Sequence, residues 1–147
     1  MRRMLVVLAA VFATAALAAP AAFAASPHYV RGPTATVSGN SLTVSWKAAG
    51  LGNTVESVDF ALTGTANVTS QCFTRSGNPV QGVPKNETVD VDVTGTFPVR
   101  NGSVTGELTV SPLSTLTCTG SQHVEILSVS FDLTLTGDDL PPVQLTG

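Results

Sequence analysis

The sequence predicts an all-β protein: an antiparallel β-sandwich of about seven strands, immunoglobulin-like in the loose sense, with one disulfide. Apolar and polar residues alternate with a period of two along nearly the whole chain, and no segment keeps the apolar stripe of a helix. Only 12% of the residues are charged, while β-branched and hydroxyl-bearing side chains are common. A small closed barrel is the alternative architecture.

The first residues predict a secretory signal peptide. Two arginines precede an apolar run from Met4 to Ala19, and the small-residue motif Ala22-Phe23-Ala24 follows. The run is too short and wrongly flanked for a membrane-spanning helix. We therefore expect cleavage after Ala24 and export to an oxidising compartment, as a secreted or cell-surface protein without a membrane span in its mature chain.

Composition limits the function classes open to the mature chain. Removing residues 1–24 leaves 123 residues, enough for one domain with a modest core. Five basic residues then face ten acidic ones, a net charge of −5 with neutral histidines. The basic residues are scattered singly, at Arg31, Lys47, Arg75, Lys85 and Arg100. Nucleic acid and anionic lipid are therefore not expected as partners, because both need clustered positive charge.

The alternating pattern divides the mature chain into three parts. Residues 25–33 are expected to form a flexible lead, residues 34–137 the sandwich domain, and residues 138–147 a flexible tail. The tail prediction rests on its Asp-Asp and Pro-Pro pairs, which are turn and loop signals.

A first hairpin is expected around Gly39-Asn40. With this pair as a two-residue turn, Val37 lies opposite Leu42 and Ala35 lies opposite Val44. All four side chains then point to one face, so the turn and the apolar pattern agree.

A second hairpin is expected around Asn101-Gly102, between alternating segments at 89–99 and 104–110. Its register would place Val99, Phe97, Gly95 and Val93 opposite Val104, Gly106, Leu108 and Val110, in that order. Large residues would thus face glycines. Pro98 would fall at a hydrogen-bonded position without an N–H, so we expect a bulge, a longer loop or an edge strand there.

The remaining segments complete the seven strands. One strand covers 58–66, and a shorter one covers 68–73. The clearest inward stripe comprises Leu127, Val129, Phe131, Leu133 and Leu135. Loops are expected at 75–86 and at 112–122.

Cys72 and Cys118 are the only cysteines, and in an exported protein they are expected to form one disulfide between two otherwise weakly held segments. The chain-entropy model assigns such a loop roughly 4 kcal/mol of stabilisation. The alternative is a redox-active or metal-binding pair, which the absence of C-x-x-C and of clustered histidines disfavours. Trp46 precedes both cysteines, so the Cys–Trp–Cys order of true immunoglobulin domains is absent.

No motif for catalysis stands out, and the chain is expected not to be an enzyme. There is no G-x-S-x-G, and the histidines are His28 and His123. A triad through His123 is the alternative to a solvated histidine at a strand edge. Asp90 and Asp92 share the outward face of one strand, with Glu87 just before it. They could gather Ca²⁺, but acids on a sheet face are more often solubilising. No cofactor is expected.

The aromatic side chains point to a core. Trp46, Phe60, Phe97 and Phe131 fall on inward stripes. A carbohydrate-binding face would need outward aromatics, and the pattern contains none.

The chain resembles small secreted β-sandwich proteins of actinomycete bacteria. The resemblance covers most of the mature chain and rests on the twin-basic, Ala-rich leader, Pro33-Thr34-Ala35-Thr36-Val37, Asn40-Ser41-Leu42-Thr43-Val44-Ser45-Trp46, Ala49-Gly50-Leu51-Gly52 and Val104-Thr105-Gly106-Glu107-Leu108-Thr109-Val110-Ser111. It implies a fold, a bacterial source and export, not an activity.

A weaker resemblance is to the neocarzinostatin-type apoproteins, secreted β-sandwiches that carry a small apolar chromophore. It rests on the segment from Pro33 to Val37, on Ala49-Gly50-Leu51 and on Gln71-Cys72. Those proteins have two disulfides, whereas this chain has two cysteines in all. No ligand residues are therefore carried over.

Three functions are compatible with these observations. The first is a non-catalytic structural or interaction module that engages an extracellular protein or an envelope component. The second is a small-molecule carrier of the neocarzinostatin type, which requires a pocket between the sheets. The third is a hydrolase or a protease inhibitor, for which the loop at 75–86 would face the protease.

Overall fold

The computed structural model describes residues 25–147, so the predicted signal peptide lies outside the described residues. Residues 25–147 form seven strands and no helix that could cross a membrane. The strands are β1 (His28–Ser38), β2 (Ser41–Ala49), β3 (Ser57–Phe73), β4 (Lys85–Pro98), β5 (Val104–Val110), β6 (His123–Gly137) and β7 (Val143–Thr146).

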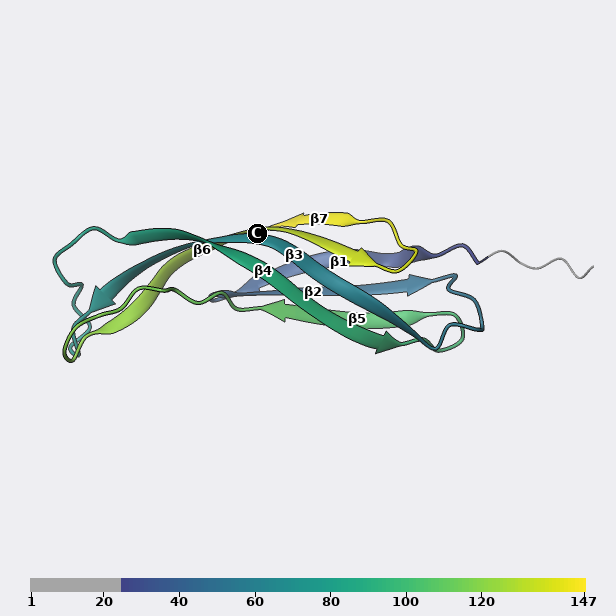
Figure 1. The fold of residues 1–147 in the computed structure, drawn as a ribbon, viewed down its shortest axis with the longest axis horizontal. Helices are drawn as coiled ribbons and strands as arrows, with labels where there is room; N and C mark the ends of the chain where they lie inside the picture. The colour runs from purple at the N-terminus through teal and green to yellow at the C-terminus, as the bar shows by residue number, and fades with distance from the viewer. Residues whose placement is uncertain (1–24) are drawn as a thin grey trace, which may run out of the picture.

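The strands form two antiparallel sheets that pack face to face (Figure 1). One sheet has the order β1-β2-β5, and the other has the order β4-β3-β6-β7. The predicted sandwich is therefore confirmed. The alternative of a closed barrel is wrong, because each sheet keeps two separate edges.

The first hairpin is confirmed in its register. Val37 pairs with Leu42 and Ala35 with Val44 across the turn at Gly39-Asn40. Leu42 and Val44 are fully buried, which shows that turn geometry and apolar alternation specify the same pairing.

The predicted pairing of the two strands of the second hairpin is wrong, although the turn between them forms. Asn101 and Gly102 have φ angles of 52° and 69°, and the backbones of Arg100 and Ser103 bond each other. Beyond this turn, β4 pairs with β3 and β5 pairs with β2. The physical reason is strand length: β3 pairs with β4 from Lys85 to Pro98, whereas the seven-residue β5 would leave half of β4 unpaired.

The opposition of large and small residues survives with other partners: Gly106 lies opposite Trp46 within the three-stranded sheet, and it faces Phe97 across the interior, as Gly95 faces Leu108. A Cβ added to Gly106 would lie 2.5 Å from the ring of Trp46 and 3.0 Å from that of Phe97. A Cβ added to Gly95 would lie 3.2 Å from Leu108. Pro98 lies at the end of β4, and β4 is an edge strand. Of the three expectations for this proline, the edge strand is therefore confirmed.

Both segments expected to be flexible are instead strands. The predicted lead belongs largely to β1, where Tyr29 pairs with Ala48 and packs against the core. The predicted tail contains β7, which pairs with β6, and it buries Leu140 in the turn before β7 and Leu145 within the strand. Isolated apolar residues beside Pro and Asp pairs were too sparse a pattern to indicate pairing at a sheet edge.

β3 and β6 also differ from the expectation. The two strands predicted at 58–66 and 68–73 form one continuous strand, β3. The register of β3 with β6 shifts between Thr69 and Ser70, so Leu127 falls in a bulge and is half-exposed. After the bulge, the inward residues of β6 therefore start at Val129 and not at Leu127. Before the bulge, Val124 and Ile126 occupy the inner side of the strand.

The core is filled by three aromatic rings and a surrounding layer of aliphatic side chains. The ring centroid of Trp46 lies 4.5 Å from that of Phe60 and 5.2 Å from that of Phe97. Phe131 is also buried, so all four aromatics predicted for the core contact it. The indole Nε1 of Trp46 and the hydroxyl of Tyr29 are buried without a hydrogen-bond partner among the described residues, and burial raises the pKa of Tyr29.

Gly106→Ala is expected to lower the free energy of unfolding by about 1–3 kcal/mol, because the new methyl group would overlap the Trp46 ring. The measurement is urea denaturation. Gly32→Ala is the matched control, since a Cβ there meets no atom within 4 Å and should leave the midpoint nearly unchanged. Equal midpoints for both variants would contradict this packing.

Candidate functional site

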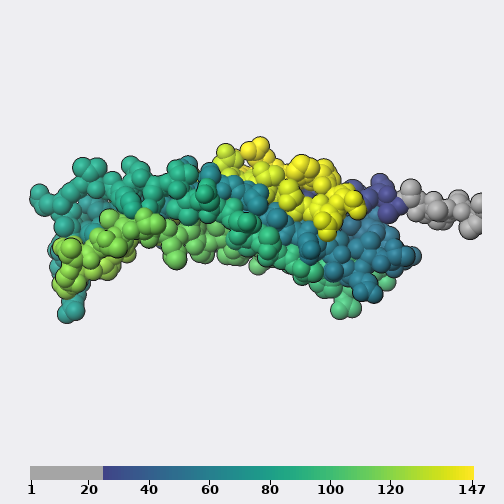
Figure 2. All heavy atoms as spheres, in the orientation of Figure 1, coloured from purple at the N-terminus to yellow at the C-terminus, as the bar shows by residue number. Residues whose placement is uncertain are grey.

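The four-stranded sheet continues beyond the three-stranded one at one end of the molecule. β3, β4 and β6 run past the end of their partner sheet, and loops 74–84 and 111–122 lie there (Figure 1). We call these two loops and the strand ends that they join the disulfide end. It forms one tip of the elongated body, opposite the end at which the described part of the chain begins (Figure 2).

Cys72 and Cys118 form the predicted disulfide, with their Cα atoms 5.8 Å apart. The bond joins the end of β3 to loop 111–122, and no free cysteine remains among residues 25–147. The loop therefore takes the place of the missing partner sheet over the extended part of β3 and β4.

A polar clamp fixes loop 111–122 a second time. Alternation places Lys85 and Glu87 on the inner face of β4, where the loop passes. The Thr115 N–H donates to Glu87 Oε1 at 2.8 Å, and its hydroxyl donates to Oε2 at 2.6 Å. Lys85 Nζ lies 3.0 Å from Glu87 and donates to Thr115 Oγ1 at 2.5 Å. The Ser70 hydroxyl, fully buried on β3, bonds that of Ser114 at 2.6 Å.

The clamp stabilises the charged form of Glu87. Hydrogen bonds from Ser114, Thr115 and Lys85 lower the pKa of Glu87 from its ordinary value of 4.5 to about 2. Lys85 forms an ion pair with Glu87 and donates to Thr115 Oγ1, whose hydroxyl in turn donates to Glu87, so the three side chains are joined in one cluster. The cluster is thus a structural tether.

The lowered pKa predicts a pH-dependent stability. The contribution of Glu87 is fully present above pH 4.5, the unfolded value, and is lost as the pH falls towards about 2. Glu87→Gln should therefore flatten the decline of the urea midpoint between pH 4.5 and 2. Glu107→Gln, which changes an exposed glutamate on β5, is the control and should leave the decline as in the wild type. An unaltered decline in Glu87→Gln would refute the tether.

Loop 74–84 is braced at both ends. Near its start, the Thr74 and Asn78 backbones bond each other, and the Val80 N–H donates to the Cys72 carbonyl at 2.9 Å. The Gln71 side chain donates to the Val80 carbonyl at 3.1 Å. At its end, β4 begins at Lys85, which the clamp holds. Residues 81–83, between these anchors, are exposed.

The disulfide end carries the two most exposed large apolar side chains of residues 25–147. Val83 in loop 74–84 is 93% exposed, and Leu113 in loop 111–122 is 76% exposed. Each lies two residues before a member of the clamp, Lys85 or Thr115. A hollow of about 200 Å³ over the disulfide is lined by both loops and includes Val83 but not Leu113. The sequence predicted both loops to within two residues of their ends, although residues 85–86 belong to β4 and not to the loop. It did not single out Val83 or Leu113, because the apolar pattern does not show which apolar side chains stay exposed.

The chemical candidates from the sequence are dispersed. His28 Nδ1 lies 2.8 Å from the Ser26 carbonyl, and His123 pairs with Glu125 at 2.9 Å. Asp90 and Asp92 are exposed on the outer face of β4. Within residues 25–147, no three His, Cys, Asp or Glu side chains gather as metal ligands.

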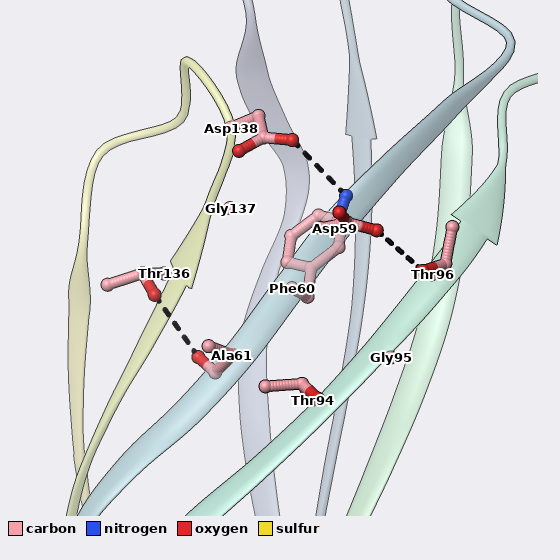
Figure 3. Close-up of a pocket in the computed structure, with 9 residues that line it drawn as sticks. All are labelled: Asp59, Phe60, Ala61, Thr94, Gly95, Thr96, Thr136, Gly137 and Asp138. Carbon is pink, nitrogen blue, oxygen red and sulfur yellow. Dashed lines mark hydrogen bonds between the residues drawn. The ribbon is translucent and has the colours of Figure 1, made fainter.

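A polar cleft of about 550 Å³ lies on the outer face of the four-stranded sheet (Figure 3). Thr96 Oγ1 donates to Asp59 Oδ1 at 2.5 Å, and the Asp59 N–H donates to Asp138 Oδ2 at 3.3 Å. Thr136 donates to the Ala61 carbonyl at 3.4 Å. These groups bond one another and surround no outward aromatic platform, so the cleft is assigned no ligand.

Comparison with known proteins leaves the disulfide end to be interpreted from its own chemistry. No protein-family model matches the chain, and neither a curated protein nor a solved structure matches it.

Proposed function

We propose that this chain is an exported, non-catalytic interaction module that binds a protein partner through the disulfide end. The observation that carries the proposal is the position of Val83 and Leu113. These two side chains project from loops that a disulfide and a hydrogen-bonded clamp hold in place. An apolar group presented on a rigid support loses little conformational entropy on binding, which favours affinity.

The export part of the proposal is supported by the N-terminal segment and by the disulfide. The charged start, apolar run and Ala22-Phe23-Ala24 exit are typical of a signal peptide. A structural disulfide in a small domain is typical of oxidising compartments.

The packed interior favours the module over a small-molecule carrier of the neocarzinostatin type. Trp46, Phe60 and Phe97 fill the space between the sheets, where a carrier needs a pocket. The cleft of about 550 Å³ and another of about 740 Å³ are lined mainly by outer-face and loop residues.

The test is capture of partners from culture supernatant and envelope fractions on the immobilised mature chain. Val83→Ser with Leu113→Ser should abolish capture of any partner that the wild type binds specifically. Val30→Ser with Val37→Ser is the matched control, because it removes two exposed valines from β1 and leaves the disulfide end intact. Equal capture by both double variants would refute the assignment to the disulfide end.

The small-molecule carrier is the alternative function. It is tested by measuring whether extracts of apolar small molecules raise the melting temperature of the mature chain. The module predicts no stabilisation by any extracted compound. A saturable shift that Val83→Ser with Leu113→Ser leaves intact would favour the carrier.

A further inference from the structure

Loop 74–84 has the construction of a segment that is presented to a partner in one conformation. Its first half is bonded to the end of β3 through the Val80 N–H and carbonyl. Its last residue precedes Lys85, which pairs with Ser70 in the sheet and bonds Thr115. The disulfide lies directly behind, since Cys72 accepts the Val80 N–H. The exposed part is thus a short span between two fixed points.

Val83 is the side chain that this span presents. At 93% exposure, it contacts almost nothing in its own protein, whereas other apolar residues at this end, such as Val80 and Leu116, are partly covered. A β-branched side chain has few χ1 rotamers, so little freedom is lost when a pocket encloses it. Pro84 follows, with a fixed φ and no N–H, which further restricts the backbone at Val83.

We propose that residues 81–84 enter the active-site cleft of an extracellular serine protease and place Val83 in a small apolar specificity pocket. The inference rests on the proposed function and names its partner class. Pocket size and polarity decide which side chain a serine protease accepts, and a small pocket accepts a small aliphatic group. The complex is non-covalent, and the rigid loop holds the Val83–Pro84 bond uncleaved in the cleft.

Two features favour a protease over other protein partners. The exposed part is a short segment, which fits a cleft that binds peptide chain, rather than a broad apolar surface. Its neighbours Gln81, Gly82 and Pro84 carry no charge, so recognition depends on one side chain and on the backbone, as it does in a protease cleft.

The experiment titrates the mature chain, with its disulfide intact, against pancreatic elastase, whose specificity pocket is small, and against trypsin. Wild type should slow hydrolysis of a chromogenic peptide by elastase and leave trypsin unaffected. Val83→Lys should weaken elastase inhibition by about 10-fold or more and create inhibition of trypsin. Val30→Ser is the matched control, since it changes an exposed valine of β1 outside the disulfide end and should leave elastase inhibition as in wild type.

The inference is overturned if wild type leaves elastase unaffected and Val83→Lys leaves trypsin unaffected. It is also overturned if Val30→Ser weakens elastase inhibition as much as Val83→Lys, or if mass analysis shows rapid cleavage after residue 83. Its failure is distinguishable from that of the proposed function. Capture that depends on Val83 and Leu113, without protease inhibition, would leave the module intact and refute only this partner class.

Discussion

Replacing both Cys72 and Cys118 with serine is expected to lower the free energy of unfolding by about 4 kcal/mol. The two cysteines are 46 residues apart in sequence, and the bond removes conformations of this long loop from the unfolded chain. Loop 111–122 also depends on it, because the other bonds described for the loop are those of Ser111 at its start, of the Ser114–Thr115 region and of local turns. A loss of this size is comparable to much of a small domain's total stability.

The measurement is urea denaturation followed by the fluorescence of Trp46, the only tryptophan. Wild type treated with a reductant should unfold at nearly the midpoint of the double serine variant, because both lack the cross-link. A double variant that unfolds within about 1 kcal/mol of the oxidised wild type would contradict the stabilising role of the bond.

Trp46→Ala is expected to cost about 3–5 kcal/mol, the usual range for removing a large aromatic side chain from a core. The ring contacts Phe60 and Phe97 and lies against Gly106, so neighbouring strands cannot close the resulting cavity without moving both sheets. Folding cooperativity should decline together with the midpoint.

Trp46→Phe is the matched control and should cost much less, since it keeps a ring and removes an indole N–H that is buried without a partner. Far-ultraviolet circular dichroism in urea is the measurement, because both variants lack the fluorophore. Similar losses in the alanine and phenylalanine variants would show that the ring does not fill the interior as described.

The disulfide end illustrates how far sequence reasoning reached. The pairing of Cys72 with Cys118 followed from their number and from the predicted export, and both loops were located from Gly, Pro and Asn content. The clamp was not predicted. Lys85 and Glu87 meet Thr115 only because the disulfide lays loop 111–122 across the inner face of β4, and no local pattern encodes that path.

The second turn shows a different limit. Asn101-Gly102 determined a tight reversal of the chain, and this reversal is present. Whether the flanking strands pair with each other depends on which other strands compete for their edges. β3 and β2 are the better partners, so β4 and β5 separate into opposite sheets.

The sequence by itself determined the strand class, most of the inward residues, the turn positions and the cross-link, because each depends on a local period, a backbone preference or a count. Only the tertiary structure decided which edges pair, that residues 28–33 and 143–146 join the sheets, and that Val83 and Leu113 stay uncovered. These features depend on competition among distant segments for hydrogen bonds and for buried area, and such competition is settled only when the whole chain packs.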